Sequence, residues 1–380
     1  MSATLKKRLK ALAIVVLVLS PIWGSVLAWW GQPTSPRSVV VVNYTVPYEN
    51  YQVHSGLMWV LDHARVRPPM LEGSWRPAFD YVGYQPTDRD LPTRLSEISL
   101  EPYDTIYLSD AYGVYEADLQ EENLRQQRPH LEYSTLLFGG YNAADLDALG
   151  AHVVGGGDVI AEFNCLGAPT ATRESELLQR MLGVRWSGWS GRVFSTLVNE
   201  QEVPPWVRDQ FAAQYPDRAL PDEPSLLLVH RDGTLIVWSA DSLDKVVPLL
   251  RSTPEGRQRL GSPSSDAPYF GWFALVEAVS PTLTAATLNL PAMTQNSLES
   301  ATHGLASSYA AITLATVGES DRLYLAFDAS NLDELPRSYR VRWLSKWMPL
   351  LHRRHDVWSA QPAFWQVYVP MMLRFMRETP

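Results

Sequence analysis

The sequence predicts an α/β protein with a doubly wound, mostly parallel sheet, an additional α+β region towards the C-terminus and one transmembrane helix before both. Three observations lead to this prediction. Short apolar, β-branched runs end in polar residues, as buried parallel strands do. Stretches with helical spacing separate these runs, and this alternation is typical of βαβ units. A continuous apolar segment near the N-terminus follows a group of cations.

The N-terminal segment carries the strongest single signal. The lysines and arginine of the basic segment, residues 1–10, precede an apolar run over residues 11–30. About 20 apolar residues are enough to cross a bilayer, and the cations predict that the N-terminus stays in the cytoplasm. The small residues Val26 and Ala28 also fit a cleaved signal peptide, but the full length of the run favours an uncleaved signal anchor. Both interpretations place the main domain outside the cytoplasm, in the periplasm or the extracellular space, and the second keeps it on the cell membrane.

After a linker over residues 31–38, residues 39–200 are expected to form an α/β domain. The expected strands are 39–43, 79–84, 103–109 and 159–163. The expected helices are 53–64, 143–150 and 172–182. Apolar residues recur at helical spacing in the helices and without interruption in the strands, and this pattern favours a parallel sheet buried on both faces.

Residues 201–380 are expected to form an α+β extension packed on this domain. The expected strands are a hairpin over 225–239 and two further strands at 310–316 and 322–327. The aromatic, Met-rich tail over 362–376 contains Pro370 and is too short to span a membrane. We therefore predict that the tail is a helix packed on the domain.

Composition excludes several classes of function. The net charge is -9, and no basic stripe follows the first ten residues, so a nucleic-acid partner is not expected. The single cysteine, Cys165, excludes an internal disulfide and a multi-cysteine zinc site. The eight histidines show no metal-binding spacing. We therefore predict no metal site and no cofactor.

Part of the chain, from about residue 39 to 182, resembles the class I glutamine amidotransferase-like superfamily, whose fold is flavodoxin-like. The segments that carry the resemblance are VVVVN (39–43), YDTIYLSDAYGVY (103–115), the glycine-led helix approach (139–150) and GGGDVIAEFN (155–164). The resemblance implies a three-layer fold with a ligand edge at the strand ends. Sugar-processing β-galactosidases contain a related non-catalytic domain, which implies a polysaccharide context.

The catalytic machinery of that superfamily does not carry over. Active members need a cysteine in a tight strand-to-helix elbow, with a His-x-Glu pair further along the chain. Here the expected elbow reads Ser109-Asp110-Ala111-Tyr112-Gly113, without a cysteine. The His-x-Glu sequence, His130-Leu131-Glu132, precedes Cys165 and so has the wrong order. The chain is therefore not expected to be a glutamine amidotransferase.

Polar residues follow the expected strands, where an open parallel sheet binds its ligands. These residues are Asn43, Asp110, Glu162, Asn164 and Asp328. Asp110 and Glu162 would serve as the acid and base of a hydrolase if they lie about 5–10 Å apart, and otherwise they are polar strand ends that cap turns. Glu162 falls inside an apolar strand and needs a partner: an arginine such as Arg192 would make it structural, and a substrate hydroxyl would make it functional.

The string from Trp186 to Arg192, WSGWSGR, is the most unusual local sequence. Trp186, Trp189 and Arg192 together fit an aromatic platform with a guanidinium for a sugar or an anion. The alternative is an irregular edge strand that buries its tryptophans. Cys165 follows a strand end, but an isolated cysteine is more often a small buried hydrophobe than a nucleophile.

Three functional hypotheses follow. The first is a membrane-tethered, non-catalytic amidotransferase-like module, attached through residues 11–30, that binds a glycan or a protein partner in the cell envelope. The second is a carbohydrate-active hydrolase that uses Asp110 and Glu162. The third is a scaffold subunit of an envelope complex, which predicts an exposed apolar patch, for instance on the C-terminal tail.

Overall fold

We analysed a computed structural model of the chain. It describes residues 20–68, 73–88, 92–126, 134–199, 202–261, 266–295, 297–332, 335, 340–351 and 361–377. The basic segment, the first part of the predicted transmembrane run and the His130-Leu131-Glu132 sequence lie outside the described residues. Among the described helices, none is both long and apolar enough to cross a membrane.

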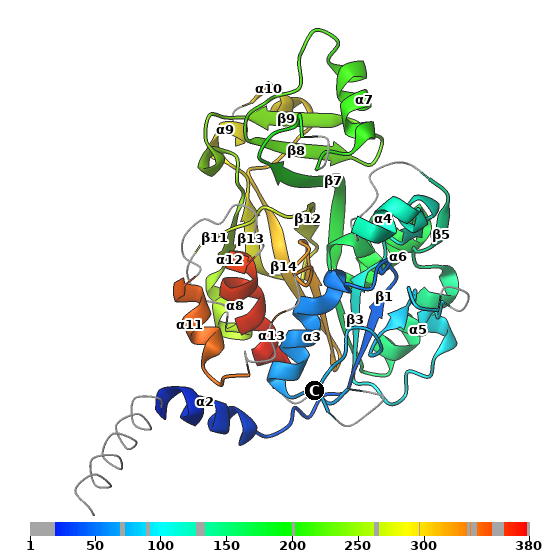
Figure 1. Cartoon of the computed structure of the whole chain (residues 1–380), viewed down its shortest axis with the longest axis vertical. Coiled ribbons are helices and arrows are strands. Elements are labelled where there is room, and N and C mark those ends of the chain that lie inside the picture. The colour runs from blue at the N-terminus through cyan, green and yellow to red at the C-terminus, as the bar shows by residue number, and fades with distance from the viewer. Residues whose placement is uncertain are drawn as a thin grey trace, which may run out of the picture.

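Within the described residues, one mixed sheet of thirteen strands is the framework of the molecule (Figure 1). Its main path contains β1 (Val39–Asn43), β2 (Val82–Gly83), β3 (Thr105–Asp110), β6 (Asp158–Ala161), β7 (Val184–Phe194), β8 (Ser225–His230), β9 (Leu235–Ser239), β12 (Phe273–Ala278), β14 (Ser308–Val317) and β15 (Ser320–Leu325). The order is β2-β1-β3-β6-β15-β14-β12-β7-β8-β9. Off this path lie β10 (Leu249–Ser252), β11 (Ala267–Pro268) and β13 (Leu283–Asn289). A separate pair joins β4 (Val114–Tyr115) and β5 (Leu136–Phe138).

The sheet has a parallel half and an antiparallel half. The strands from β2 to β15 run parallel to their neighbours, whereas the pairings from β15 onwards are antiparallel. The coarse prediction of an α/β protein with a large sheet is confirmed. The sheet does not divide near residue 200, because β15, β14 and β12 from the C-terminal segment lie between β6 and β7.

Helices cover both faces of the parallel half. They are α3 (Gln52–Ala64), α5 (Ala143–Val154), α6 (Thr172–Leu182), α12 (Gln361–Ala363), the π-helical turn η6 (Phe364–Tyr368) and α13 (Val369–Phe375). A further helix, α8 (Pro254–Leu260), packs between β13 of the antiparallel half and α13. Alternate residues of β1 point to opposite sides: Val39 and Val41 join the core under α3 and the C-terminal helices, and Val40 and Val42 join the core under α5 and α6. The parallel half is therefore buried on both faces, as its continuous apolar strands predict.

The remaining helical elements lie at the periphery. They are α2 (Ser20–Trp30), α4 (Glu121–Gln126), α7 (Pro205–Gln214), α9 (Ala292–Gln295), α10 (Leu298–Thr302), α11 (Leu344–Leu351) and the 3-10 turns η1 (Leu95–Glu97), η2 (Glu116–Leu119), η3 (Phe163–Cys165) and η4 (Leu243–Lys245). Figure 1 shows α2 at one end of the molecule, beside α11, and α7 and α10 at the opposite end.

Several element boundaries differ from the sequence prediction. The strand expected over 79–84 is only Val82–Gly83, and Gly83 has a φ of +152° and sits so close to β1 that a Cβ would lie 1.8 Å from the carbonyl oxygen of Asn43. The strand expected over 159–163 ends at Ala161, so the prediction that Glu162 lies inside a strand is wrong. β7 lies between β12 and β8, but among the described strands β8 pairs only with Trp189–Phe194, so the alternative of an edge strand is wrong for the second part of WSGWSGR, whereas Trp186 pairs with β12 alone.

The C-terminal tail is helical and packed on the domain, as predicted. Trp365 and Tyr368 are fully buried, and α13 packs against α3 and α8 (Figure 1). Pro370 lies in the first turn of α13, where a missing backbone N–H is tolerated, and the preceding turn is π-helical. The tail thus fills one face of the parallel half.

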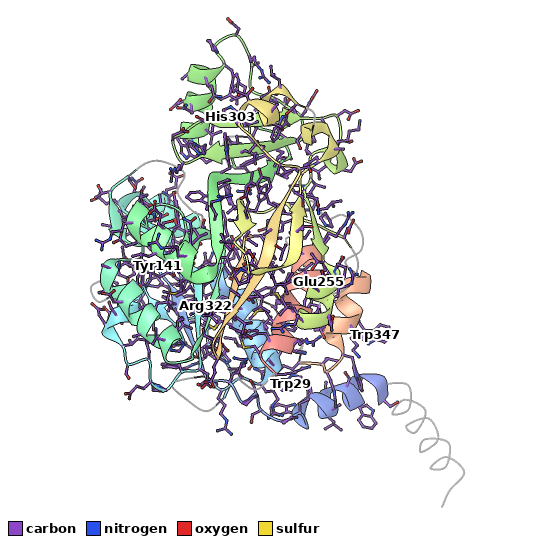
Figure 2. All side chains as sticks on the ribbon, turned by 180° about the vertical axis from the view of Figure 1, so that it is seen from behind. Trp29, Tyr141, Glu255, His303, Arg322 and Trp347 are labelled. Carbon is purple, nitrogen blue, oxygen red and sulfur yellow. The ribbon has the colours of Figure 1, made fainter. Side chains whose placement is uncertain are left out.

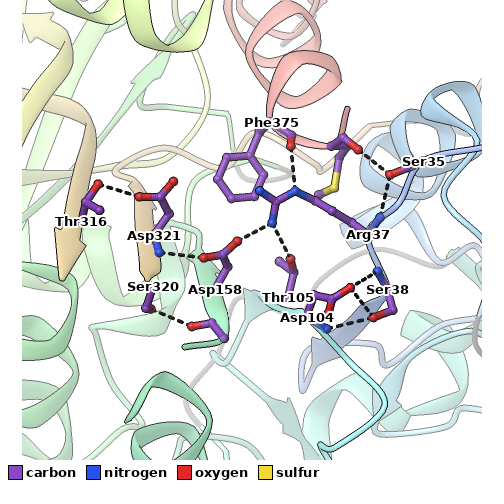
Figure 3. A network of polar contacts seen from close by, with 12 residues as sticks. Ser35, Arg37, Ser38, Asp104, Thr105, Asp158, Thr316, Ser320, Asp321 and Phe375 are labelled. Atoms are coloured by element: carbon purple, nitrogen blue, oxygen red, sulfur yellow. Dashed lines mark hydrogen bonds and ion pairs between the residues drawn. The ribbon is translucent and has the colours of Figure 1, made fainter. Parts of the chain in front are cut away.

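The amino ends of the parallel strands are joined by a buried polar network (Figure 3). Arg37 forms an ion pair with Asp158, and its guanidinium also donates to the Thr105 hydroxyl at 3.3 Å and to the Phe375 carbonyl at 2.9 Å. Asp158 accepts a further hydrogen bond from the backbone N–H of Asp321 at 2.6 Å. This amino-edge network connects the linker, β3, β6, β15 and the C-terminal helix.

Candidate functional site

The carboxyl ends of the parallel strands carry two groups of polar residues. We define the inner cluster as Asn43, His54, Tyr107, Ser109, Glu162, Ser330 and Tyr368. We define the rim cluster as Asp110, Asn164, Arg192, Asp328 and Asn331. The inner cluster is buried, whereas Asn164, Arg192, Asp328 and Asn331 are partly exposed. Together they contain each polar strand-end residue that the sequence singled out.

Glu162 is the centre of the inner cluster. It directly follows β6, which lies between β3 and β15, and it is 1% exposed. One carboxylate oxygen accepts hydrogen bonds from the backbone N–H groups of Ala329 and Ser330, both at 3.2 Å, and from the Ser330 hydroxyl at 3.0 Å. The other oxygen contacts the hydroxyl of Tyr107, which lies 2.8 Å from the hydroxyl of Tyr368. These partners are hydroxyl and backbone groups, not Arg192.

Burial sets the protonation state of Glu162. Burial first, and then the charge of nearby Asp328, raise the pKa of Glu162 to about 8, although the hydrogen bonds from Tyr107 and Ser330 oppose this shift. Glu162 therefore keeps its proton at neutral pH. The pKa values of Tyr107 and Tyr368 are also raised well above the ordinary value, chiefly by burial, so both phenols stay neutral.

Asn43 and His54 extend the inner cluster to α3. The His54 Nε2 lies 2.9 Å from the Pro77 carbonyl oxygen, to which it donates, and burial lowers the pKa of His54 to about 4. The neutral ring therefore accepts at Nδ1 from the Asn43 amide, 3.1 Å away. The same amide lies 3.3 Å from the Ser109 hydroxyl, which lies 3.2 Å from that of Ser330. Ser109, in the expected nucleophile elbow, is thus buried and joins Asn43 to Ser330 in a series of hydrogen bonds.

Asp110 belongs to the rim cluster, at the end of β3. One carboxylate oxygen accepts from the Thr45 hydroxyl at 2.6 Å and from the Tyr112 backbone N–H at 2.7 Å. The other accepts from the side-chain amide of Asn164 at 2.9 Å. Burial raises the pKa of Asp110, and these three hydrogen bonds oppose the shift. The predicted pair Asp110 and Asn164 is therefore in direct contact.

Asp328 connects the rim cluster to the inner cluster. Its carboxylate accepts from the side chain of Asn331 at 2.9 Å, and its backbone N–H donates to the Trp272 carbonyl at 3.1 Å. Burial and the charge of Asp110 raise the pKa of Asp328 to about 7, against the opposing effects of Asn331 and Arg192. Because Asp328 also raises the pKa of Glu162, charge on one strand end is felt at the others.

Arg192, on β7, is the cation that interacts with the Asp328 carboxylate, since its charge lowers the pKa of Asp328. Its guanidinium lies 4.8 Å over the ring of Phe194, and burial lowers its pKa, whereas the charges of Glu202 and Asp328 raise it. The guanidinium donates no hydrogen bond to another residue in the described part of the chain. A buried carboxylate oxygen of Glu202 likewise has no partner there. Arg192, whose guanidinium is not hydrogen-bonded to another described residue, is therefore close enough to interact electrostatically with both Glu202 and Asp328.

The two tryptophans of the WSGWSGR string do not form one platform. Trp189 is buried, with its ring 4.9 Å from His230 and 5.4 Å from His303. Trp186 is partly exposed and belongs to the opposite core, and its indole N–H donates to the Trp189 carbonyl at 2.9 Å. Figure 2 labels His303 at the end of the molecule that holds α10. Trp186 and Arg192 thus remain candidates for ligand contact, and Trp189 is a core residue.

Sequence reasoning missed several residues of the two clusters. Ser330 and Asn331 closely follow the predicted strand-end residue Asp328 but were not singled out, whereas Tyr368 and Trp272, which borders the rim cluster, come from segments far from the predicted strand ends. One residue, Tyr107, could have indicated the inner cluster from the sequence, because a tyrosine inside a buried strand needs a hydrogen-bond partner for its hydroxyl. The sequence alone could not identify that partner as Tyr368.

Neither a nucleophilic thiol nor a metal site forms among the described residues. Cys165 is fully buried, its thiol donates to the Leu108 carbonyl at 3.4 Å, and burial raises its pKa. No group of three or more His, Cys, Asp or Glu residues has a metal-binding arrangement in the described ranges. The chain matches no protein-family model, and no curated protein matches it.

Proposed function

We propose that the chain is a membrane-tethered, extracytoplasmic module with a flavodoxin-like, amidotransferase-like domain, and that it binds a glycan of the cell envelope without catalysing a reaction. The basic segment and the apolar run over residues 11–30 support the tether and its orientation. The polar residues at the carboxyl ends of the parallel strands support the position of the binding site. The ligand contacts are proposed to come from the rim cluster.

The observation that carries this proposal is the unused hydrogen-bonding capacity beside Asp328. The Arg192 guanidinium has several N–H donors and bonds to no other described residue. Trp272, whose carbonyl accepts from the Asp328 backbone N–H, is partly exposed and can present indole surface near these groups. Sugars are held by charged, planar hydrogen-bonding groups together with aromatic faces. The rim cluster offers the charged groups, and Trp272 beside it offers the aromatic face.

The inner cluster supports the absence of catalysis. A hydrolase that uses Asp110 and Glu162 needs both carboxyls at the substrate. Glu162 has the raised pKa of an acid catalyst, which favours this alternative, but both of its oxygens already have hydrogen-bond partners in the protein and its side chain is buried. Ser109 is 3% exposed and Cys165 is fully buried, so neither is placed for attack on a substrate. We therefore favour binding over hydrolysis.

The scaffold alternative predicts an exposed apolar patch, for instance on the C-terminal tail. The described tail is buried instead, since Trp365, Tyr368 and Met376 are fully covered. The tail therefore gives no support to a protein-binding patch at this position.

A ligand screen of the full chain in detergent tests the proposal. Thermal unfolding is measured with a set of envelope oligosaccharides, on wild type and on Arg192→Met. A ligand at 100 times its dissociation constant stabilises the native state by about 2.7 kcal/mol, and we expect Arg192→Met to abolish this gain. Arg185→Met is the matched control, because Arg185 lies on the same strand but is exposed and pairs with Glu277. Equal stabilisation of wild type and Arg192→Met, or none with any sugar, would refute the proposed site, and turnover of a bound sugar would favour the hydrolase.

A further inference from the structure

Exposed tryptophans gather where α2 meets the segment that leads into α11. The large apolar side chains concerned, with their exposed fractions, are Trp23 (46%), Leu27 (60%), Trp30 (59%), Trp343 (41%) and Trp347 (62%). The backbone N–H of Arg342 donates to the Ser25 carbonyl at 3.3 Å, so the two segments touch. Figure 2 shows Trp347 on α11 at the edge of the molecule, above α2. We call these five residues the tryptophan surface.

The body of the protein holds α2 in place through its opposite side. Trp29 is buried, and its indole N–H donates to the His63 carbonyl at 3.1 Å. The guanidinium groups of Arg65 and Arg340 lie 5.6 Å and 5.5 Å from its ring centre. Since Trp29 anchors α2, the outward position of Trp23, Leu27 and Trp30 follows from the packing of the helix.

Cations accompany the tryptophan surface. Arg342 and Lys346 are exposed, and neither forms an ion pair within the described residues. Burial and then the like charge of Arg342 lower the pKa of Arg377, which places a third cation close by. Arg340, by contrast, pairs with Asp62 at 2.7 Å. The surface therefore combines indole rings with positive charge that the described part of the protein leaves unneutralised.

This chemistry matches the interface of an anionic bilayer. Tryptophan is favoured at the headgroup level because its ring is apolar and its N–H is polar, and nearby lysines and arginines are attracted to anionic lipids. A protein–protein interface also uses tryptophan, but its core is depleted in lysine. The position of the surface points the same way, because α2 is the C-terminal part of the apolar run over residues 11–30.

We propose that the tryptophan surface docks on an anionic membrane surface, so that α11 is a second membrane contact that does not span the bilayer. This inference rests on the membrane tether of the proposed function. The amino edge of the parallel sheet follows α2 after the linker, and the strands run away from it (Figure 1). Docking through α2 and α11 therefore presents the rim cluster away from the lipid, towards ligands in the envelope.

The test uses the full chain reconstituted in lipid nanodiscs, either neutral phosphatidylcholine or phosphatidylcholine with phosphatidylglycerol. Trp347→Cys is labelled with an environment-sensitive fluorophore, and the native thiol does not interfere because Cys165 is buried. Leu298→Cys is the matched control, since Leu298 is 80% exposed on α10, at the opposite end of the molecule. We expect a blue-shifted emission that brominated lipid quenches for the label at 347, stronger in anionic discs, and a water-like emission at 298.

A charge-reversed variant separates docking from tethering. Arg342→Glu with Lys346→Glu, placed in the Trp347→Cys chain, should return the label to a water-like emission while the protein still co-elutes with the discs. A water-like label at 347 in anionic discs, with the wild-type cations present and the chain in the disc, would overturn the docking proposal and leave the tether intact. Burial of the label by self-association in lipid-free detergent would overturn it in favour of a second copy. A chain that enters neither disc would overturn both docking and tether.

Discussion

The two edges of the parallel half differ in how their buried carboxyl groups are compensated. At the amino edge, Asp158 contacts Arg37, and the guanidinium is completed by the Thr105 hydroxyl and the Phe375 carbonyl (Figure 3). At the carboxyl edge, burial raises the pKa values of Asp110, Glu162 and Asp328. The charge of Asp110 raises the pKa of Asp328 further, and the charge of Asp328 raises that of Glu162, which contacts no cation among the described residues.

This difference teaches which edge serves the fold and which is available for function. A buried ion pair with its remaining hydrogen bonds satisfied is a structural device. Carboxyl groups whose pKa is raised towards neutral pH by burial are costly to ionise. Such groups occur at functional sites more often than elsewhere. Burial also raises the pKa of Asp158, but Arg37 and the Asp321 N–H directly oppose the shift. The comparison predicts that removing an acid has opposite effects on stability at the two edges.

The largest effect is expected at the amino edge. Asp158→Ala leaves the Arg37 guanidinium buried without its carboxylate, so we expect a loss of about 3–5 kcal/mol of unfolding free energy, measured by denaturant unfolding. The double variant Arg37→Met with Asp158→Leu removes both charges and should recover much of this loss. A cost below about 1 kcal/mol for Asp158→Ala would show that the ion pair is not structural.

An effect of the opposite sign is expected for Glu162→Gln. The pKa of Glu162 is about 8 in the folded chain against 4.5 ordinarily, so its favourable contribution is complete below about pH 4.5 and is lost as pH rises through about 8. Wild-type stability should therefore fall with pH in this window, by at most about 1.4 kcal/mol per pH unit from this group. Glu162→Gln should flatten the profile and unfold less readily than wild type at about pH 9. Parallel profiles for the two proteins would contradict this expectation.

The smallest stability change is expected for Asp328→Asn, at the rim. The pKa of Asp328 is about 7 against 3.8 ordinarily, so its contribution also falls as pH rises through about 7. The amide should stabilise the chain by about 1 kcal/mol at pH 8, measured by thermal unfolding, and should weaken binding of a sugar found in the screen about tenfold. A gain in stability without any loss of binding would leave Asp328 outside the ligand site.

The sequence predicted the parallel half well because its signals are local. β1 and β3 are continuous apolar runs. The two helices α3 and α6 have apolar residues at clear helical spacing. The length of β2 was overestimated, because the aromatic residues over 79–84 resemble a longer strand. The close approach of Gly83 to Asn43 depends on tertiary structure. Propensity alone does not register such contacts.

The candidate site was predicted in part for the same reason. Because parallel strands place their carboxyl ends at one edge, Asn43, Asp110 and Glu162 could be placed there from the sequence. The partners that seal Glu162 could not be foreseen, since Ser330 and Tyr368 are supplied by distant segments of the chain. The insertion of β15 beside β6 also has no local signal, because its neighbour in the sequence is the hairpin strand β14.

The most direct test of the contrast between the two edges is the protonation state of Glu162. Infrared spectra of the full chain in heavy water are recorded between about pH 5 and 9, and the spectrum of Glu162→Gln is subtracted from that of wild type at each pH. We predict a protonated carboxyl band at about pH 6 that disappears as the pH passes about 8. A difference spectrum that contains only an ionised carboxylate at pH 6 would contradict the account, because it would mean that the carboxyl edge neutralises its charges as the amino edge does.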